Sequence, residues 1–70
     1  MNRSTVDINI RPYLNTHGHE PRGTGNWGFQ IRDAIFCYQT PYSRAVAAIK
    51  REARQQQQYL GYAPSITLLP

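Results

Sequence analysis

The chain has 70 residues and a single cysteine, which puts it near the lower size limit for a stable apolar core and excludes the disulfide-stapled class of small secreted proteins. Eight Lys and Arg residues against four Asp and Glu residues give a net charge of +4, which favours an anionic partner such as nucleic acid. No apolar run approaches the roughly 20 residues of a membrane span, and the polar N-terminus is not a signal peptide. We therefore expect one cytoplasmic domain over residues 1–70, with no membrane contact.

The N-terminal part of the chain predicts one strand and one loop. Residues 5–11 alternate between Ile or Val on one side and polar side chains on the other, which is typical of a strand with one buried face. Pro12 lacks the backbone donor that a sheet needs, so we expect the strand to end there. Residues 14–26 are rich in Gly, Pro, Asn and Thr. They predict a long loop that is either functional or a plain connection.

The next stretch predicts a β-hairpin with strands over residues 26–32 and 34–39, joined by a tight turn. Pleating divides its side chains between two faces. We expect the side facing a helix to hold Trp27, Phe29, Ile31, Ile35 and Cys37. The open face then holds Gly28, Gln30, Arg32, Phe36 and Tyr38. Aromatic rings beside an arginine suit stacking on nucleic-acid bases, and an exposed aromatic patch equally suits a protein partner.

An amphipathic helix is expected after the hairpin. Thr40 is expected to cap it, and Pro41 suits the first helical position, where a missing donor costs nothing. The spacing predicts a buried stripe of Tyr42, Ala45, Val46, Ile49, Ala53 and Gln56. Gly61 ends the helix, and the alternating residues 65–69 predict a last strand. The expected fold class is α+β, a three- to four-stranded antiparallel sheet packed on one helix in the order β-β-β-α-β.

Residues 22–53 contain a recognisable pattern. Gly25 stands two residues before the aromatic Trp27, Ile31 and Arg32 stand four and five after it, and the alanine-rich segment RAVAAIKREA follows a short aromatic strand. In these features the chain resembles the plant ethylene-response-factor type of DNA-binding domain, whose fold is shared by arm-binding domains of phage integrases. The resemblance implies a three-stranded sheet on one helix. It implies DNA contacts by Arg22, Asn26, Arg32 and Phe36. The chain departs from the family at residues 17–20, which replace an arginine-rich strand, and at Ala34, which replaces an arginine.

The predicted loop also contains His17, His19 and Glu20, and Cys37 is the only thiol. A structural zinc site needs four ligands, commonly paired cysteines and histidines, so we predict no metal and no cofactor. No serine or cysteine lies with a base in a recognisable catalytic motif, and the four acids are scattered along the chain. We therefore do not expect an enzyme.

These observations predict a small non-enzymatic nucleic-acid-binding protein, for DNA rather than RNA, of the kind that a phage or mobile element encodes. The predicted contacts on the sheet face and the loop before it are Arg11, Arg22, Asn26, Gln30, Arg32, Phe36 and Tyr38. A basic stripe on the predicted helix is formed by Arg44, Lys50, Arg51 and Arg54. This stripe is either a solvated face or a contact for a second segment of nucleic acid or an acidic protein.

The alternative function is that of a phage-type inhibitor of a host defence complex, similar in size to anti-CRISPR proteins, that acts by protein–protein binding. Such an inhibitor relies on aromatic anchors such as Tyr13, Phe36, Tyr38 or Tyr59. Its affinity depends less on salt than that of a DNA binder. A homodimer is compatible with both functions, because a domain this small gains core by association.

Overall fold

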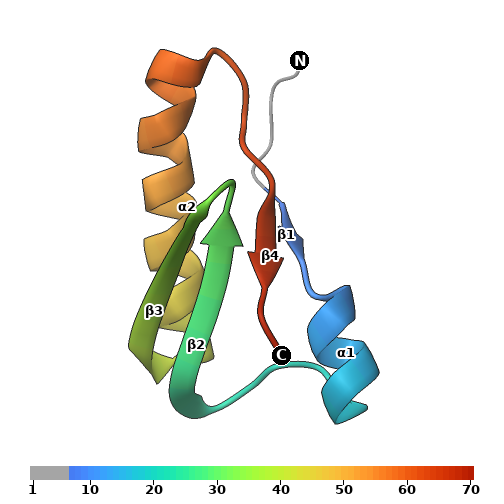
Figure 1. Cartoon of the computed structure of the whole chain (residues 1–70). Coiled ribbons are helices and arrows are strands. Elements are labelled where there is room, and N and C mark those ends of the chain that lie inside the picture. The colour runs from blue at the N-terminus through green and yellow to red at the C-terminus, as the bar shows by residue number, and fades with distance from the viewer. Residues whose placement is uncertain (1–6) are drawn as a thin grey trace.

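The computed structural model describes residues 7–70 and contains six elements (Figure 1). In chain order they are β1 (Ile8–Asn9), α1 (Arg11–His17), β2 (Thr24–Ile31), β3 (Ala34–Pro41), α2 (Tyr42–Leu60) and β4 (Ile66–Leu68). The strands form one sheet in the order β1-β4-β2-β3, and α2 packs on one face of it. The fold class is therefore α+β, as predicted.

The sheet is mixed, which corrects the prediction of a purely antiparallel sheet. β2 pairs antiparallel with both β3 and β4, whereas β1 pairs parallel with β4. The element order is β-α-β-β-α-β, with one helix more than the predicted β-β-β-α-β. Local alternation in the sequence identifies the segments that form strands. It does not determine whether two strands that are distant in sequence pair parallel or antiparallel.

The additional helix is α1, and it replaces the end of the predicted N-terminal strand. Pro12 lies in its first turn, where the missing backbone donor has no helical partner in any case. The Oδ1 atom of Asn9 accepts a hydrogen bond from the N–H of Arg11 at 3.1 Å, and Gly18 ends the helix with a φ of 76°. The prediction that Pro12 ends a strand reaching residue 11 is therefore wrong. The first two residues of that predicted strand, Thr5 and Val6, lie outside the described residues.

The loop predicted over residues 14–26 is much shorter in the structure. Its first residues, from Leu14 to His17, belong to α1, and its last three belong to β2. Only residues 18–23 connect the two elements, so the prediction of a long loop is wrong at both ends. Gly18 ends α1, and Gly25 and Asn26 lie near the start of β2. These turn-forming residue types therefore do not belong to one long loop.

The hairpin and the long helix are confirmed with small changes of boundary. β2 begins two residues earlier than predicted, and β3 runs two residues further, so that Thr40 and Pro41 belong to the strand. Thr40 therefore does not cap α2, which has no side-chain cap hydrogen bond. Gly61 ends α2 as predicted, with a φ of 84° and its N–H donating to the carbonyl of Gln57.

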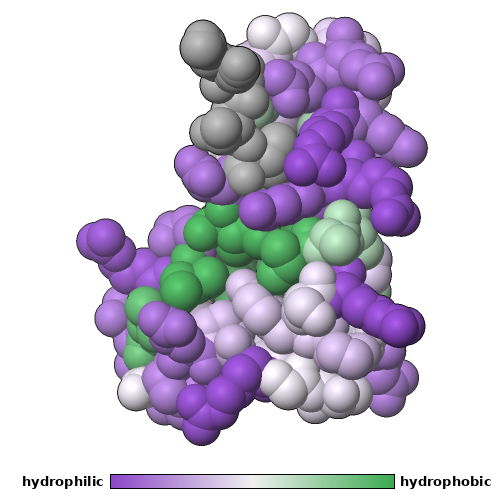
Figure 2. All heavy atoms as spheres, turned by 180° about the vertical axis from the view of Figure 1, so that it is seen from behind, coloured by the Kyte–Doolittle hydropathy of each residue, from purple (hydrophilic) through white to green (hydrophobic). Residues whose placement is uncertain are grey.

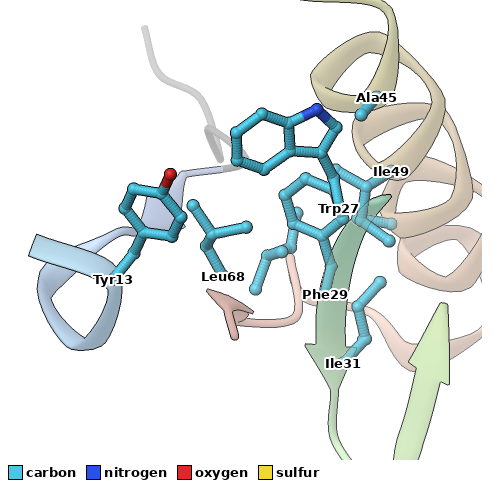
Figure 3. Packing of buried hydrophobic residues seen from close by; sticks show 9 residues of the cluster. Tyr13, Trp27, Phe29, Ile31, Ala45, Ile49 and Leu68 are labelled. Atoms are coloured by element: carbon cyan, nitrogen blue, oxygen red, sulfur yellow. The ribbon is translucent and has the colours of Figure 1, made fainter. Parts of the chain in front are cut away.

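The core lies between the sheet and α2 (Figure 3). Its members are Tyr13, Trp27, Phe29, Ile31, Ala45, Ile49, Ala53, Ile66 and Leu68. Five large side chains are almost completely buried, namely Phe29, Ile31, Ile49, Ile66 and Leu68, and each stabilises the fold by about 1.5–3 kcal/mol through its burial. The stripe predicted for α2 is confirmed at Ala45, Ile49 and Ala53, which supply the helical side of this core.

Trp27 occupies the edge of the core between α1 and α2. Its ring centroid lies 5.7 Å from that of Tyr13 and 4.8 Å from that of Tyr42. The indole N–H is buried and has no hydrogen-bond partner among the described residues, and in Figure 3 it points away from Tyr13. Tyr13 thus joins α1 to the core through an aromatic contact that the sequence did not predict.

No helix within residues 7–70 has the length and apolar character needed to cross a membrane. From behind, the molecule shows an apolar band across its middle, with mostly hydrophilic side chains above it (Figure 2). The face opposite α2 is the open face of the sheet.

Candidate nucleic-acid interface

Among the described residues, the open face of the sheet has no charged side chain on its strands and mixes amide side chains with apolar ones. Asn26 and Gln30 of β2 are exposed and alternate with the buried side chains of that strand, so they point to the open face together with Gly28. The predicted placement of Gly28 and Gln30 is therefore confirmed. The Nε2 atom of Gln30 donates a hydrogen bond to the carbonyl of Arg32 at 3.1 Å. The exposed residues of β3 on the same face are Ile35, Cys37 and Gln39.

Phe36 and Tyr38 lie on the opposite side from the predicted one. In the hairpin register Phe36 pairs with Phe29, and Tyr38 pairs with Trp27, and directly paired residues point to the same face of a sheet. Both rings pack against the core. Burial, with a smaller contribution from the Glu52 carboxylate, raises the pKa of the Tyr38 hydroxyl. The prediction that Phe36 and Tyr38 form an exposed stacking platform is wrong, as is the prediction that Ile35 and Cys37 face the helix.

Arg32 is not on a strand face. It occupies the first position of the two-residue turn that joins β2 to β3, with a φ of 56°. Arg22 lies before the other end of β2, so about eight strand residues, roughly 25 Å, separate the two arginines. Arg11 begins α1, on an element that lies across the sheet from β3 (Figure 1). The three predicted arginines are all exposed, but the fold does not bring them together.

One pair of predicted site residues does meet. Arg22 and Asn26 line a groove of about 540 Å³ that runs between α1, the start of β2 and the end of the described chain. The other lining residues are Tyr13, His17, Thr24, Gly25, Trp27, Gly28, Cys37, Leu69 and Pro70. The groove opens where β4 ends, because β4 pairs only with Phe29–Ile31 of β2. A single further hydrogen bond, from the N–H of Leu69 to the carbonyl of Gly28, continues this pairing at 2.8 Å.

The wall of the groove on the α1 side is aromatic. The rings of Tyr13 and His17 are stacked, with centroids 4.0 Å apart and an angle of 21° between their planes, and His19 lies 6.0 Å from each of them. Within residues 7–70, no three His, Cys, Asp or Glu side chains are gathered so that they could hold a metal ion. The rings of His17 and His19 thus pack with that of Tyr13. The sequence analysis did not predict this cluster because it did not predict α1.

The exposed face of α2 gathers positive charge. This helix contains four of the eight Lys and Arg residues and one of the four acids, so it carries +3 of the chain's net charge of +4. Arg44, Arg51 and Arg54 are all exposed. At about 100° per residue they fall within an arc of roughly 80° that is centred opposite the buried stripe, and they span about 15 Å of the helix axis.

The single acid of α2 lies away from this arc. Glu52 is half-buried and accepts a hydrogen bond from the Nε2 atom of Gln56 at 3.2 Å. Gln55 and Gln58 are both exposed. At about 100° per residue Gln58 falls within the arc of the arginines, and Gln55 lies about 20° beyond the edge that Arg44 marks. We name Arg44, Arg51, Arg54, Gln55 and Gln58 the α2 basic face. Within residues 7–70, this surface holds three exposed arginines on one side of a single helix.

Of the four aromatic anchors expected for a protein inhibitor, Tyr13, Phe36 and Tyr38 belong to the domain's own core or pack against it. Tyr59, with 76 % of its surface exposed, is the one that is available to a partner. Comparison of the chain with known protein families, with curated proteins and with solved structures found no match. The resemblance to the ethylene-response-factor type of domain therefore stays a prediction.

Proposed function

We propose that this protein binds nucleic acid, duplex DNA in preference to RNA, without catalysing a reaction, and that the α2 basic face is its main contact surface. The observation that carries the proposal is the concentration of three exposed arginines on one side of a 19-residue helix. The proposed surface differs from the sheet face and loop that the sequence favoured, because the described strands place no charged side chain on the open sheet face and its two predicted aromatic residues face the core.

The chemistry of the α2 basic face suits this partner. Arginine offers a planar fork of donors that pairs with phosphate oxygens and with the edge of guanine. Exposed glutamines one and four residues after Arg54 provide the donor and acceptor pair that matches the edge of adenine. The major groove of B-DNA admits an α-helix, whereas the deep and narrow major groove of duplex RNA does not, and this difference favours DNA.

The test compares two variants that lose the same charge in different places. The first replaces the basic face, Arg44→Gln/Arg51→Gln/Arg54→Gln. The second replaces three scattered exposed arginines, Arg11→Gln/Arg22→Gln/Arg32→Gln. Each is titrated with a random-sequence DNA duplex from about 50 to 200 mM salt, beside the unchanged protein, after circular dichroism has shown that each variant is folded. A duplex RNA competitor measures the preference for DNA.

The unchanged protein is expected to bind DNA with an affinity that falls steeply as salt rises, because arginine–phosphate contacts release counterions. The basic-face variant should lose most of its binding and up to about 2.7 units of the log–log salt slope, at 0.9 per lost phosphate contact. The variant with three scattered substitutions should keep most of its DNA affinity and most of its salt slope. Equal losses in the two variants would contradict a localised α2 site, and no binding by the folded protein at 50 mM salt would exclude the proposed function.

The inhibitor alternative predicts a different set of results. Its remaining exposed anchor is Tyr59, near the end of α2, with 76 % of its surface exposed, and the neighbouring Tyr62, just beyond the helix, is 54 % exposed. Exposed tyrosines are enriched among the residues that dominate protein–protein affinity. If the protein binds no DNA, the pair Tyr59→Ala/Tyr62→Ala is the variant to compare with the unchanged chain in a search for a protein partner.

A further inference from the structure

β3 has an outer edge that no strand within residues 7–70 covers. It is the last strand in the order β1-β4-β2-β3 and pairs only with β2 (Figure 1). The two-residue turn makes Ile31 and Ala34 a hydrogen-bonded pair, so the backbone groups of every second residue from Ala34 onward point to β2. The groups of the alternate residues, Ile35, Cys37 and Gln39, therefore point outward from the sheet.

This edge has none of the features with which proteins usually protect an exposed strand. Natural edge strands are short, carry charged side chains or an internal proline, or are interrupted by a bulge. β3 has eight residues, AIFCYQTP, with no charge and with proline only at its end. Its register with β2 is continuous from Ala34 to Pro41, so it has no bulge. Ile35 is 60 % exposed.

We propose that a second copy of this chain pairs along this edge, β3 against β3 in antiparallel orientation, about a two-fold axis at Cys37. In that register Cys37 faces its own counterpart and Ile35 faces Gln39 of the other copy. Three outward N–H groups on each strand then find a carbonyl acceptor, giving six new hydrogen bonds between the copies. The result is one continuous eight-stranded sheet.

The lack of charge along β3 is what allows a second copy to be the occupant. Two chains of net charge +4 repel each other, so they can meet only where cations are not opposed. Along β3 every facing pair from Ala34 to Thr40 is uncharged. At the ends of the paired region Asp33 lies opposite Pro41 of the other copy and Arg32 lies opposite its Tyr42, so each turn brings one acid and one cation toward the start of the other copy's α2 and adds no net charge there.

The symmetry of this pairing has a consequence for DNA binding. This consequence rests on the proposed function, whereas the pairing itself does not. A two-fold axis perpendicular to the sheet leaves both α2 helices on the same side of it. The two α2 basic faces then point in one direction, and a single duplex meets six exposed arginines instead of three. Dimer formation would thus strengthen phosphate binding without a change in the monomer.

The pairing is tested without nucleic acid. Sedimentation velocity measures the mass of the reduced protein from about 5 to 500 μM. The disrupting variant is Cys37→Lys, which opposes two ammonium groups at the axis, and the matched control is Gln30→Lys, which adds the same charge to the same sheet face but on β2. Both replaced side chains are exposed, so both variants are expected to fold.

A second readout uses Cys37 itself. Hydrogen-bonded antiparallel pairs have Cα atoms about 5.5 Å apart, which is within the 4.4–6.8 Å that disulfides span. Mild oxidation should therefore link two chains of the unchanged protein quickly. Cys37→Ser/Gln30→Cys, in which the only thiol is moved to β2, should form the link at least tenfold more slowly.

The expected result is a concentration-dependent dimer that persists in Gln30→Lys and is lost in Cys37→Lys. Added salt should strengthen it, because salt screens the repulsion between the copies, whereas salt weakens DNA binding. A reduced protein that stays monomeric at 500 μM would overturn the proposal, and so would a dimer that survives Cys37→Lys or equal oxidation rates for the two thiol positions. None of these outcomes depends on whether the protein binds DNA.

Discussion

β2 and β3 are two strands of equal length in one hairpin, yet they contribute very differently to the fold. Each has eight residues and alternates along its length. β2 buries Trp27, Phe29 and Ile31, whereas β3 has no fully buried side chain. β2 lies between β3 and β4, and β3 lies at the edge. An alternating pattern thus identifies a strand, but the position of the strand in the sheet decides how much its side chains stabilise the protein.

The largest expected effect comes from removing the paired phenylalanines one at a time. Phe29 is completely buried and Phe36, its partner across the hairpin, is only partly buried. Phe29→Ala should lower the free energy of unfolding by about 3–5 kcal/mol, which is most of the stability of so small a domain. Phe36→Ala should cost about 1–2 kcal/mol, because less of its area leaves water. Urea denaturation measures both, and equal losses would contradict the comparison.

A second pair of variants tests which face of each strand is buried. Ile31→Ala should cost about 2–4 kcal/mol, because this side chain is 1 % exposed and its removal leaves a cavity. Ile35→Ala, at a position with 60 % exposure, should change the stability of the monomer by about 0.5 kcal/mol or less. The measurement is made at low micromolar concentration, where association along β3 is minimal. A loss at Ile35 as large as that at Ile31 would mean that the hairpin register is different.

The turn between the two strands should be improvable. Arg32 has a positive φ, and Asp33, which follows it, does not. These signs match a type II′ turn, which prefers glycine at its first central position. Arg32→Gly should stabilise the hairpin by about 0.5–1 kcal/mol, because relief of the unfavourable backbone conformation outweighs the added freedom of the unfolded chain. Arg11→Gln controls for the lost charge. A destabilised Arg32→Gly protein would show that the arginine side chain has a structural contact.

The smallest expected effect is seen at alkaline pH, at the tyrosines where β3 ends and α2 begins. Burial raises the pKa of the Tyr38 hydroxyl, with Glu52 adding to the effect, and burial raises that of Tyr42, with Tyr13 adding to it. Unfolded tyrosines ionise near pH 10, so above that pH the folded state holds more protons than the unfolded state. Stability should therefore be fully present below about pH 10 and fall as the pH rises through the folded pKa values.

This dependence is measured as the urea midpoint between pH 8 and pH 11. The variant Tyr38→Phe/Tyr42→Phe should fall less steeply above pH 10 than the unchanged protein, with the midpoints at pH 8 as the reference for each. Parallel curves for the two proteins would rule out ionisation of these hydroxyls as the cause of alkaline loss.

The parts of the fold that follow from neighbouring residues could be predicted from the sequence. The hairpin and the stop of α2 at Gly61 are of this kind. The faces of β3 were assigned wrongly because Ile35 and Cys37 are as apolar as Phe36 and Tyr38, so either set could be buried. The decision comes from the turn, whose two residues fix Phe36 opposite Phe29. α1 was missed because an alternating segment runs into it, and Pro12, which lies in the first turn of the helix, was interpreted as the end of a strand.

The candidate site was predicted less well than the fold, and for a related reason. Arg22 and Asn26 are close in sequence and do meet, in the groove beside α1. Arg22 and Arg32 do not share a surface, because the eight residues of β2 separate them by roughly 25 Å. Arg44, Arg51 and Arg54 share a face because helical spacing places them there, and this could be seen in the sequence once the helix was accepted.

The parallel pairing of β1 with β4 shapes how this protein reaches its fold. Ile8 pairs with Ile66, 58 positions further along the chain, whereas the hairpin joins residues that are close in sequence. Contacts that close long loops form more slowly than local ones, because more chain entropy must be lost before they are made. We therefore expect the hairpin and α2 to assemble first and the β1–β4 pair last. Once formed, that pair holds the beginning and the end of the described chain in a single sheet.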